Sequence, residues 1–227
     1  DIAAYRLPSL LAMLLTVYGT FRIARTLYKP PRAILAAAAC GGGLLIFAEA
    51  HLAKTDSVLM LLCLIQQFGL MRIYQAWQHG RRLSYNSYLL VWLPMAAAVL
   101  VKGPVAPLLA VTTVAALCLW HRQTGWLRML RFWRGGLLLA GITLPWAIMV
   151  TLATDGAFLD LAFRGDFVAK VQSAQESHGA PVGTYLMLLP LLIWPASLLL
   201  PRAVAQLPVL LEHVESRFLL AWIVPFW

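Results

Sequence analysis

The stretch that decides the fold is AILAAAACGGGLLIFAEAHLAKTDSVLM, residues Ala33 to Met60. An apolar run opens it, and a second apolar run begins at its end. About 20 apolar residues cross a hydrocarbon core of ~30 Å, so two such runs predict two membrane spans joined by a short connection. The connection holds four ionisable side chains: Glu49, His51, Lys54 and Asp56. Ionisable groups near a bilayer cost free energy, so their gathering here indicates a functional site.

The composition extends this prediction to the whole chain. Of the 227 residues 61% are hydrophobic and 12% are charged, whereas a soluble domain carries about 25% charged residues. The runs are apolar on every face, which excludes the alternating strands of a membrane barrel. We therefore predict an all-α, polytopic transmembrane helical bundle. Its three cysteines fall inside predicted spans, where buried packing is expected rather than disulfides or metal binding: Cys40, Cys63 and Cys118.

The apolar runs predict about seven complete spans and one truncated span. These are residues 8–28, 33–49, 57–77, 87–101, 103–120, 135–153, 183–200 and a run from 218. The chain lacks an initiator methionine and stops within an apolar stretch. We therefore expect residues 1–227 to be a single transmembrane domain, truncated at both ends.

The charges sort between the two ends of these spans. Thirteen of the 18 lysines and arginines fall on one side, and seven of the nine acids fall on the other. The positive-inside rule makes the first side cytoplasmic. The net charge of +9 is then a topology signal and a contact for anionic lipids, not for nucleic acid. Four tryptophans beside the basic loops resemble interfacial anchors: Trp77, Trp120, Trp126 and Trp133.

The loop 154–182 on the acidic side is too long for a tight turn. Its apolar residues recur at helical spacing, and most of its charges lie elsewhere around the turn. This pattern favours an amphipathic helix on the outer membrane surface. A packed soluble helix is the alternative, although the loop is too short for a separate domain.

Further ionisable residues fall on the same side as Glu49 and Asp56. Lys102 lies in VKGP, where a phosphate ligand and a snorkelling lysine are both reasonable. Asp56 is either a carboxylate in a partly dehydrated cleft or, like Thr55, a cap of the next helix. His178 beside Glu176 could be a metal ligand, a general acid or an ordinary loop histidine. Each alone could simply mark a helix end, but their convergence on one side favours a site.

Five motifs in order give this chain a resemblance to a known family. They are YRLPSLLAML, AHLAKTDSVLM, VKGPVAPLL, KVQSAQESHGAPVGTYLMLLPLLIWP and RFLLAWIVPFW. The ordered set resembles membrane glycosyltransferases of the GT-C fold, specifically the bacterial aminoarabinose (lipid A) transferases and protein O-mannosyltransferase relatives. Each motif is short and degenerate. Val182 stands where many relatives carry a second proline or an aromatic residue.

The resemblance implies an enzyme of the bacterial inner membrane that takes a sugar from a polyprenyl-phosphate carrier on the periplasmic face. The acceptor would be lipid A, another glycolipid or a protein, and a single displacement would invert the anomeric centre. The family's first external acidic loop would precede Asp1. The family's positions match Asp56, Lys102, Glu176 and His178 in this sequence. Together with the chemistry of the step, this leads us to predict catalytic roles for Asp56 and Glu49, donor phosphate binding for Lys102, Lys170, Arg164 and Lys54, acceptor binding for His51, Glu176 and Tyr185, and divalent metal binding for His178 and Glu176.

Two other classes of protein compete with this interpretation. A transporter or flippase of lipid-linked substrates is also polytopic, but it usually places charged groups near the membrane midplane. The predicted spans here are almost free of charge in their middles. A purely structural subunit would give no reason for the charge clustering. The sequence therefore favours interfacial chemistry over a pathway across the bilayer.

Overall fold

The computed structural model describes residues 2–52, 54–160 and 184–224, which form helices and their connections. The helices are α1 (Ile2–Leu27), α2 (Pro30–Gly41), α3 (Leu44–Ala50), α4 (Asp56–Gln78), η1 (Tyr85–Tyr88), α5 (Leu89–Lys102), α6 (Val105–His121), η2 (Gly125–Leu130), α7 (Phe132–Ala153), α8 (Ala157–Asp160), α10 (Thr184–Leu192), η4 (Ala196–Leu199), α11 (Leu200–Ala205), α12 (Leu207–Leu210) and α13 (Val214–Ile223).

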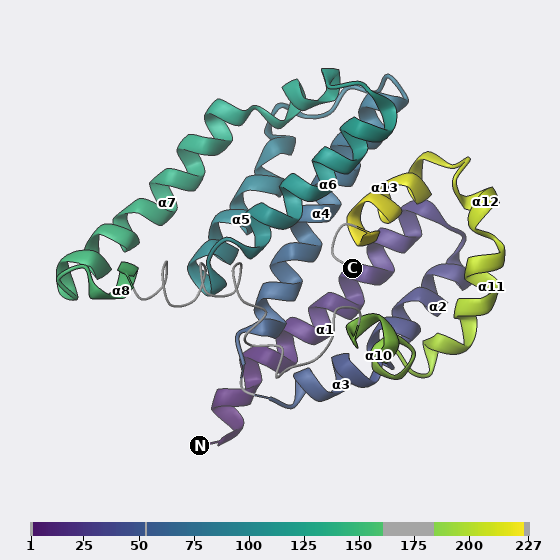
Figure 1. The fold of residues 1–227 in the computed structure, drawn as a ribbon, viewed down its shortest axis with the longest axis horizontal. Coiled ribbons are helices and arrows are strands. Elements are labelled where there is room, and N and C mark those ends of the chain that lie inside the picture. Colours follow the sequence, from purple (N-terminus) through teal and green to yellow (C-terminus); the bar gives the residue numbers. More distant parts are fainter. Residues whose placement is uncertain (1, 53, 161–183, 225–227) are drawn as a thin grey trace.

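The long helices run up and down through one bundle (Figure 1). Within the described residues four helices are long and apolar enough to span a membrane, and the bent pair α2–α3 makes a fifth if it counts as one span. The four cover residues 5–27, 56–78, 85–102 and 132–153. α6 is apolar but shorter. The all-α membrane bundle is confirmed, and its first spans match the predicted positions closely.

Two predicted spans are not continuous helices. The span 33–49 divides into α2 and α3, which are bent by 60° at Gly42–Gly43. The span 183–200 stops at Leu192 and resumes as η4 only after Pro195. Glycine and proline both weaken a helix, the first through its flexibility and the second through its missing N–H. The two breaks meet, because the Leu44 N–H donates to the Trp194 carbonyl at 3.1 Å.

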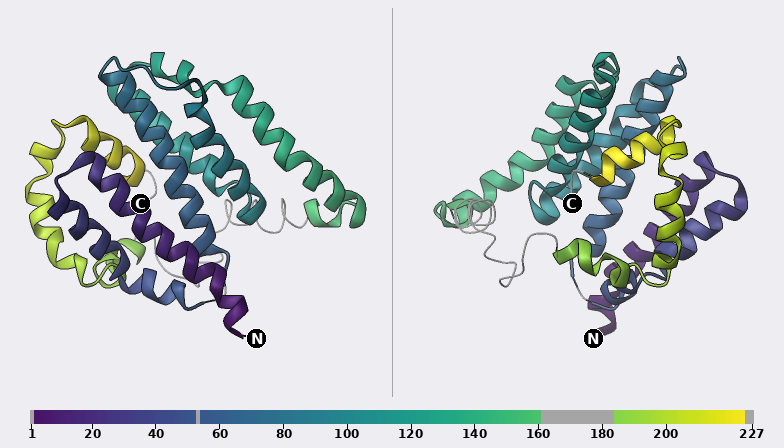
Figure 2. Two further views of the ribbon diagram at one scale, coloured as in Figure 1. Left: turned by 180° about the vertical axis from the view of Figure 1, so that it is seen from behind. Right: turned by 45° about the vertical axis from the view of Figure 1, so that its right-hand side comes forward.

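α4 lies at the centre of the bundle, packed against α1, α5 and α6 (Figure 2). Two fully buried glutamines join it to α6. The Gln66 amide donates to the Ala106 carbonyl at 2.9 Å, and the Gln67 amide donates to Thr113 Oγ1 at 3.0 Å. Hydrogen bonds between helices in a membrane contribute modestly, but they fix which faces meet. These bonds fix α6 against α4, the helix that begins at the candidate site residue Asp56.

The aromatic residues near the basic loops do not share one role. Trp120 and Trp133 are 44% and 79% exposed, as interfacial anchors would be. Trp126 is only 1% exposed and packs edge-on against Tyr74, with ring centroids 5.8 Å apart. The prediction that Trp126 is an anchor is therefore wrong, because η2 folds back and carries its indole into the core beneath α4 and α6.

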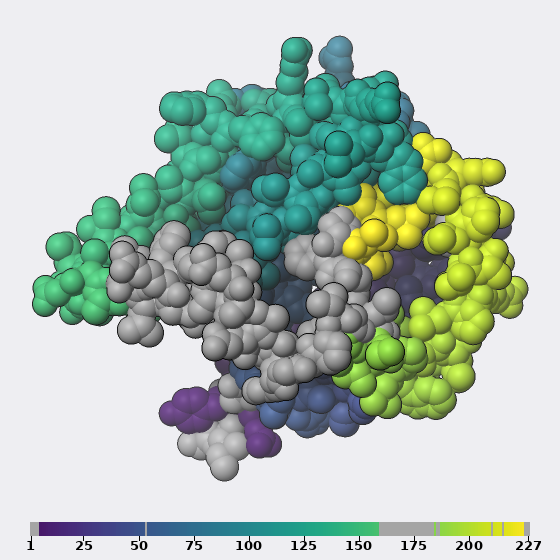
Figure 3. Space-filling model, viewed as in Figure 1, coloured from purple at the N-terminus to yellow at the C-terminus, as the bar shows by residue number. Residues whose placement is uncertain are grey.

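α7 is the most peripheral of the long helices (Figures 2 and 3). Its first turn packs tightly against α5, where Gly135 lies against the Trp92 indole. That indole donates its N–H to the Leu130 carbonyl at 2.8 Å. The rest of α7 exposes large apolar side chains such as Leu144, Met149 and Leu152, which suit contact with lipid.

Candidate functional site

The structure joins two predicted site residues that lie 46 positions apart. Asp56 is the first residue of α4, and Lys102 is the last residue of α5. The Lys102 ammonium donates a hydrogen bond to Asp56 Oδ1 and forms an ion pair with it. The Asp56 side chain is 39% exposed and the Lys102 side chain is 49% exposed. We call the part of the bundle that holds this pair, with the α3–α4 connection and the α5–α6 corner, the acidic end.

The position of Lys102 follows from its local sequence. Gly103 adopts φ +67°, a conformation that suits glycine, and Pro104 then starts the turn into α6. This sharp corner ends α5 at the lysine and leaves its side chain free to reach the start of α4. Asp56 does not cap its own helix, because Thr55 is the N-cap residue and makes no side-chain capping bond. The carboxylate is therefore directed to the lysine.

A second ion pair lies in the α3–α4 connection. Lys54 Nζ is 3.7 Å from Glu49 Oε1, and Glu49 is 21% exposed. The other carboxylate oxygen, Oε2, is buried and has no hydrogen-bond partner among the described residues. Buried polar atoms are usually satisfied, so a donor to this oxygen is expected from outside the described residues.

Two buried serines hold the connection in place. Ser9 Oγ in α1 donates to the Lys54 carbonyl at 3.0 Å, and Ser57 Oγ donates to the Glu49 carbonyl at 3.3 Å. Both serines are at most 2% exposed. Sequence reasoning missed them as site residues. The available signal was a serine placed among apolar residues at the end of a span, where only a hydrogen bond offsets the cost of burial.

His51 is the C-cap residue that follows α3, and it is exposed at the same end of the bundle. Its Nδ1 lies 2.8 Å from the Phe47 carbonyl, which can only accept, so Nδ1 carries the proton. When the ring is neutral, Nε2 is left as an acceptor. The ring also packs against Phe47, with centroids 4.6 Å apart. This orientation suits the predicted contact with an acceptor hydroxyl.

Several predicted site residues cannot be placed. Arg164, Lys170, Glu176 and His178 lie outside the described residues, as does most of the predicted surface helix in 154–182. Tyr185 lies in α10, close in sequence to the segment that meets α3, but its side chain is also outside them. The structure therefore brings together Glu49, Lys54, Asp56 and Lys102, with His51 beside them.

The described residues do not themselves make a metal site. They contain no group of three or more histidine, cysteine or acidic side chains placed to hold a metal ion. The assignment of His178 and Glu176 as metal ligands stays a prediction.

The arrangement suits the binding of an anionic group. Partly exposed ion pairs contribute only about 0–1 kcal/mol to stability, so a phosphate can replace the carboxylate as the partner of either lysine at little cost. Once released from Lys102 or Lys54, the carboxylates of Asp56 and Glu49 can accept a proton. The acidic end thus combines cations for a phosphate with bases for a hydroxyl.

The profile of the dolichyl-phosphate-mannose-protein mannosyltransferase family matches residues 1–149. Undecaprenyl phosphate-alpha-4-amino-4-deoxy-L-arabinose arabinosyl transferases from Pseudomonas paraeruginosa (strain DSM 24068 / PA7) and Pseudomonas aeruginosa (strain UCBPP-PA14) are each 28% identical over 227 residues. Each alignment covers 99% of this chain but 40% of the relative, so the chain spans about two fifths of their length.

A solved structure shows the same fold. The crystal structure of ArnT from Cupriavidus metallidurans in the apo state matches with a TM-score of 0.75 at 20% sequence identity. The match covers 97% of this chain and 39% of that one. The prediction of a GT-C-like helical bundle is therefore confirmed.

Proposed function

The chain belongs to the dolichyl-phosphate-mannose-protein mannosyltransferase family, and from this premise we propose that the full-length protein is a membrane glycosyltransferase. It takes a sugar from a polyprenyl-phosphate donor and transfers it to an acceptor on the periplasmic face of the bacterial inner membrane. The observation that supports this most directly is the contact between Asp56 and Lys102 beside the Glu49–Lys54 pair. A carboxylate and a cation close together are what displacement of a phosphate by a hydroxyl requires.

The names of the relatives suggest the donor and a first acceptor. We propose undecaprenyl phosphate-linked 4-amino-4-deoxy-arabinose as donor, because relatives that match 99% of the chain carry that name. Lipid A is the acceptor that the resemblance implies, and a protein hydroxyl is the other candidate. The polyprenyl tail stays in the bilayer while its phosphate reaches the acidic end, where the lysines lie.

The proposed step is a single displacement. The acceptor oxygen attacks the anomeric carbon, the bond from that carbon to the phosphate oxygen breaks, and polyprenyl phosphate leaves with the bonding electrons. Asp56 accepts the proton of the acceptor, and Lys102 and Lys54 stabilise the departing phosphate. Glu49 Oε2, which is buried and unpartnered among the described residues, accepts a hydrogen bond from the sugar. Backside attack inverts the anomeric centre.

The test uses the full-length protein in proteoliposomes with the lipid-linked aminoarabinose and lipid A. We expect modified lipid A and free polyprenyl phosphate in equal amounts, with the opposite anomeric configuration in the product. Mass spectrometry and NMR measure both. Movement of the labelled donor across the bilayer without transfer to lipid A or to a peptide would indicate a transporter instead.

Lys54→Met is expected to raise the KM for the donor about 10- to 100-fold, because a hydrogen bond to a charged group contributes ~1.5–3 kcal/mol. The hydrogen bond from Ser9 Oγ to the Lys54 main-chain carbonyl does not involve the lysine side chain and is unaffected by the change. Lys29→Met is the control, because Lys29 precedes α2 at the opposite end of the bundle. Steady-state kinetics compare the two variants, and equal KM values would remove Lys54 from the donor site.

Cysteine labelling tests the orientation. Ala157→Cys in α8 is expected to react with a membrane-impermeant maleimide in intact spheroplasts, whereas Ser84→Cys, before η1, should react only after permeabilisation. Both positions are exposed. Labelling of the parent protein, without an introduced cysteine, gives the background from its own three cysteines, which are half-buried. The reverse pattern would put the acidic end in the cytoplasm and contradict the proposal.

A further inference from the structure

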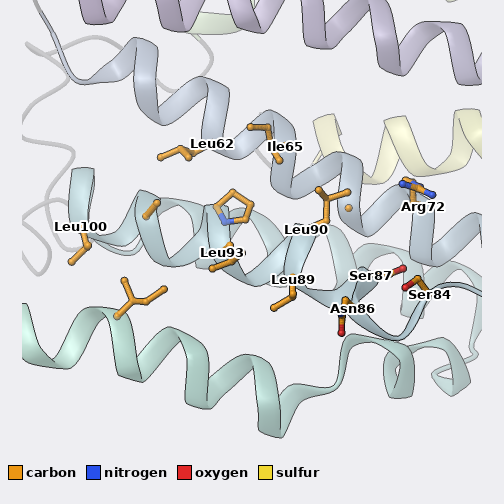
Figure 4. Close-up of a pocket in the computed structure, with 14 residues that line it drawn as sticks. Leu62, Ile65, Arg72, Ser84, Asn86, Ser87, Leu89, Leu90, Leu93 and Leu100 are labelled. Carbon is orange, nitrogen blue, oxygen red and sulfur yellow. The ribbon is translucent and has the colours of Figure 1, made fainter.

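Away from the acidic end, an apolar groove of about 820 Å³ runs between α4, α5 and α7 (Figure 4). Leu62, Leu93, Leu100 and Ile142 line its length. Polar groups gather at one end only, where Arg72, Ser84 and Asn86 lie near the start of α5. The groove is therefore amphipathic along its axis, as a lipid molecule is.

A second space of about 400 Å³ adjoins the polar end of the groove. Arg72 lines both spaces, and Gln75, His79, Arg81 and Arg82 line the second. None of the described residues that line either space is acidic. Among the described residues Arg72 forms no ion pair, and its guanidinium lies 5.8 Å from the centre of the Phe68 ring. Three arginines thus surround a polar space without a counter-charge.

We propose that these two spaces form one binding site for an anionic glycerophospholipid of the leaflet that faces the basic loops. The phosphate lies among Arg72, Arg81 and Arg82, where it supplies the missing negative charge. Ser84 and Asn86 hydrogen-bond the glycerol esters, and one acyl chain follows the groove along Leu93 toward Leu100. Basic pockets between transmembrane helices bind anionic headgroups by the same physics.

Charge and shape together select this occupant. A free phosphate would use the arginines but leave the groove unfilled, and a further helix of a longer chain would fill the groove without needing the arginines. Only a lipid with an anionic headgroup and a long apolar tail uses both. The polyprenyl-phosphate donor has the same chemistry, but its proposed phosphate ligands lie at the opposite end of α4. This inference does not rest on the proposed function.

Native mass spectrometry of the full-length protein can test the site, with phosphatidylglycerol and phosphatidylcholine added in mixed micelles. Loss of two arginines in Arg72→Gln/Arg82→Gln should weaken phosphatidylglycerol binding about 25-fold, at roughly fivefold for each charge. Phosphatidylcholine binding should change much less. The matched control is Arg25→Gln/Arg128→Gln, which removes the same charge from the same side at positions that line neither space. Equal losses in both double variants would overturn the proposal.

A second variant tests the groove separately. Ala97 lines it and is half-buried, so Ala97→Trp should fill it and lower phosphatidylglycerol binding at least tenfold without removing any charge. The thermal midpoint of each variant verifies that the protein is folded. A site for free anions would give two results: millimolar inorganic phosphate would displace phosphatidylglycerol from the parent protein, and Ala97→Trp would bind phosphatidylglycerol normally. That pair of results would contradict the lipid assignment. Resistance to phosphate together with loss in Ala97→Trp supports it.

Discussion

Asp56→Asn in the full-length protein is expected to lower the rate of sugar transfer about 10²- to 10⁴-fold, the range that general acid–base catalysis contributes. Asparagine keeps the shape of the side chain but cannot accept the proton of the acceptor hydroxyl. It also leaves Lys102 without its counter-charge. The effect on stability should be small, because both partners are partly exposed and such pairs contribute little. Transfer kinetics and the yield of membrane-inserted protein measure the two effects.

The matched control is Asp155→Asn. Asp155 is an exposed acid between α7 and α8, on the side predicted to be periplasmic, and it forms no ion pair with another described residue. Its φ of +48° is a conformation that asparagine also adopts. We expect near-normal activity for this variant. Undiminished activity in Asp56→Asn would remove Asp56 from the site, and an equal loss in Asp155→Asn would point to the charge of the surface instead.

The sequence predicted the transmembrane bundle well because burial in lipid depends on composition. Runs such as 57–77 and 135–153 are long and apolar, with Arg72 near the end of the first as their one charged residue, and both are single helices in α4 and α7. Composition says less about whether a span is one continuous helix. Apolar residues are needed in a straight span and in a bent one alike, so only Gly42 and Gly43 signalled the 60° bend between α2 and α3. Glycines in membrane helices also serve close packing, as Gly41 does against Val17.

The sequence predicted which residues belong to the candidate site, but not which of them form ion pairs with one another. The positions of Glu49, Lys54, Asp56 and Lys102 on one side followed from the alternation of spans. Their partners did not, since the contact between Asp56 and Lys102 depends on how α5 packs against α4. That packing rests on Gly69, where a Cβ atom would lie 2.9 Å from the Leu90 carbonyl carbon. A single glycine in an apolar run does not reveal which helix approaches it.

The largest stability effect is expected from Gly135→Val at the start of α7. A Cβ atom at Gly135 would lie 2.0 Å from Cε2 of Trp92, far inside contact distance. The indole cannot easily move, because it is 9% exposed and donates its N–H to the Leu130 carbonyl. Overpacking of a tight core costs ~1–3 kcal/mol and at times more. We expect a loss of about 3 kcal/mol in the free energy of unfolding, read as a lower thermal midpoint in detergent.

Gly136→Val is the control that separates this clash from the substitution itself. A Cβ atom at Gly136 meets nothing within 4 Å, although the residue is adjacent in the same helix. Valine has a better helix propensity than glycine, so Gly136→Val should be neutral or slightly stabilising. Since α7 contacts the bundle mainly through α5, the difference between the two variants measures how much this one contact holds α7 in place. Equal thermal midpoints would mean that α7 does not dock on Trp92 and that the groove between α4, α5 and α7 has a different shape.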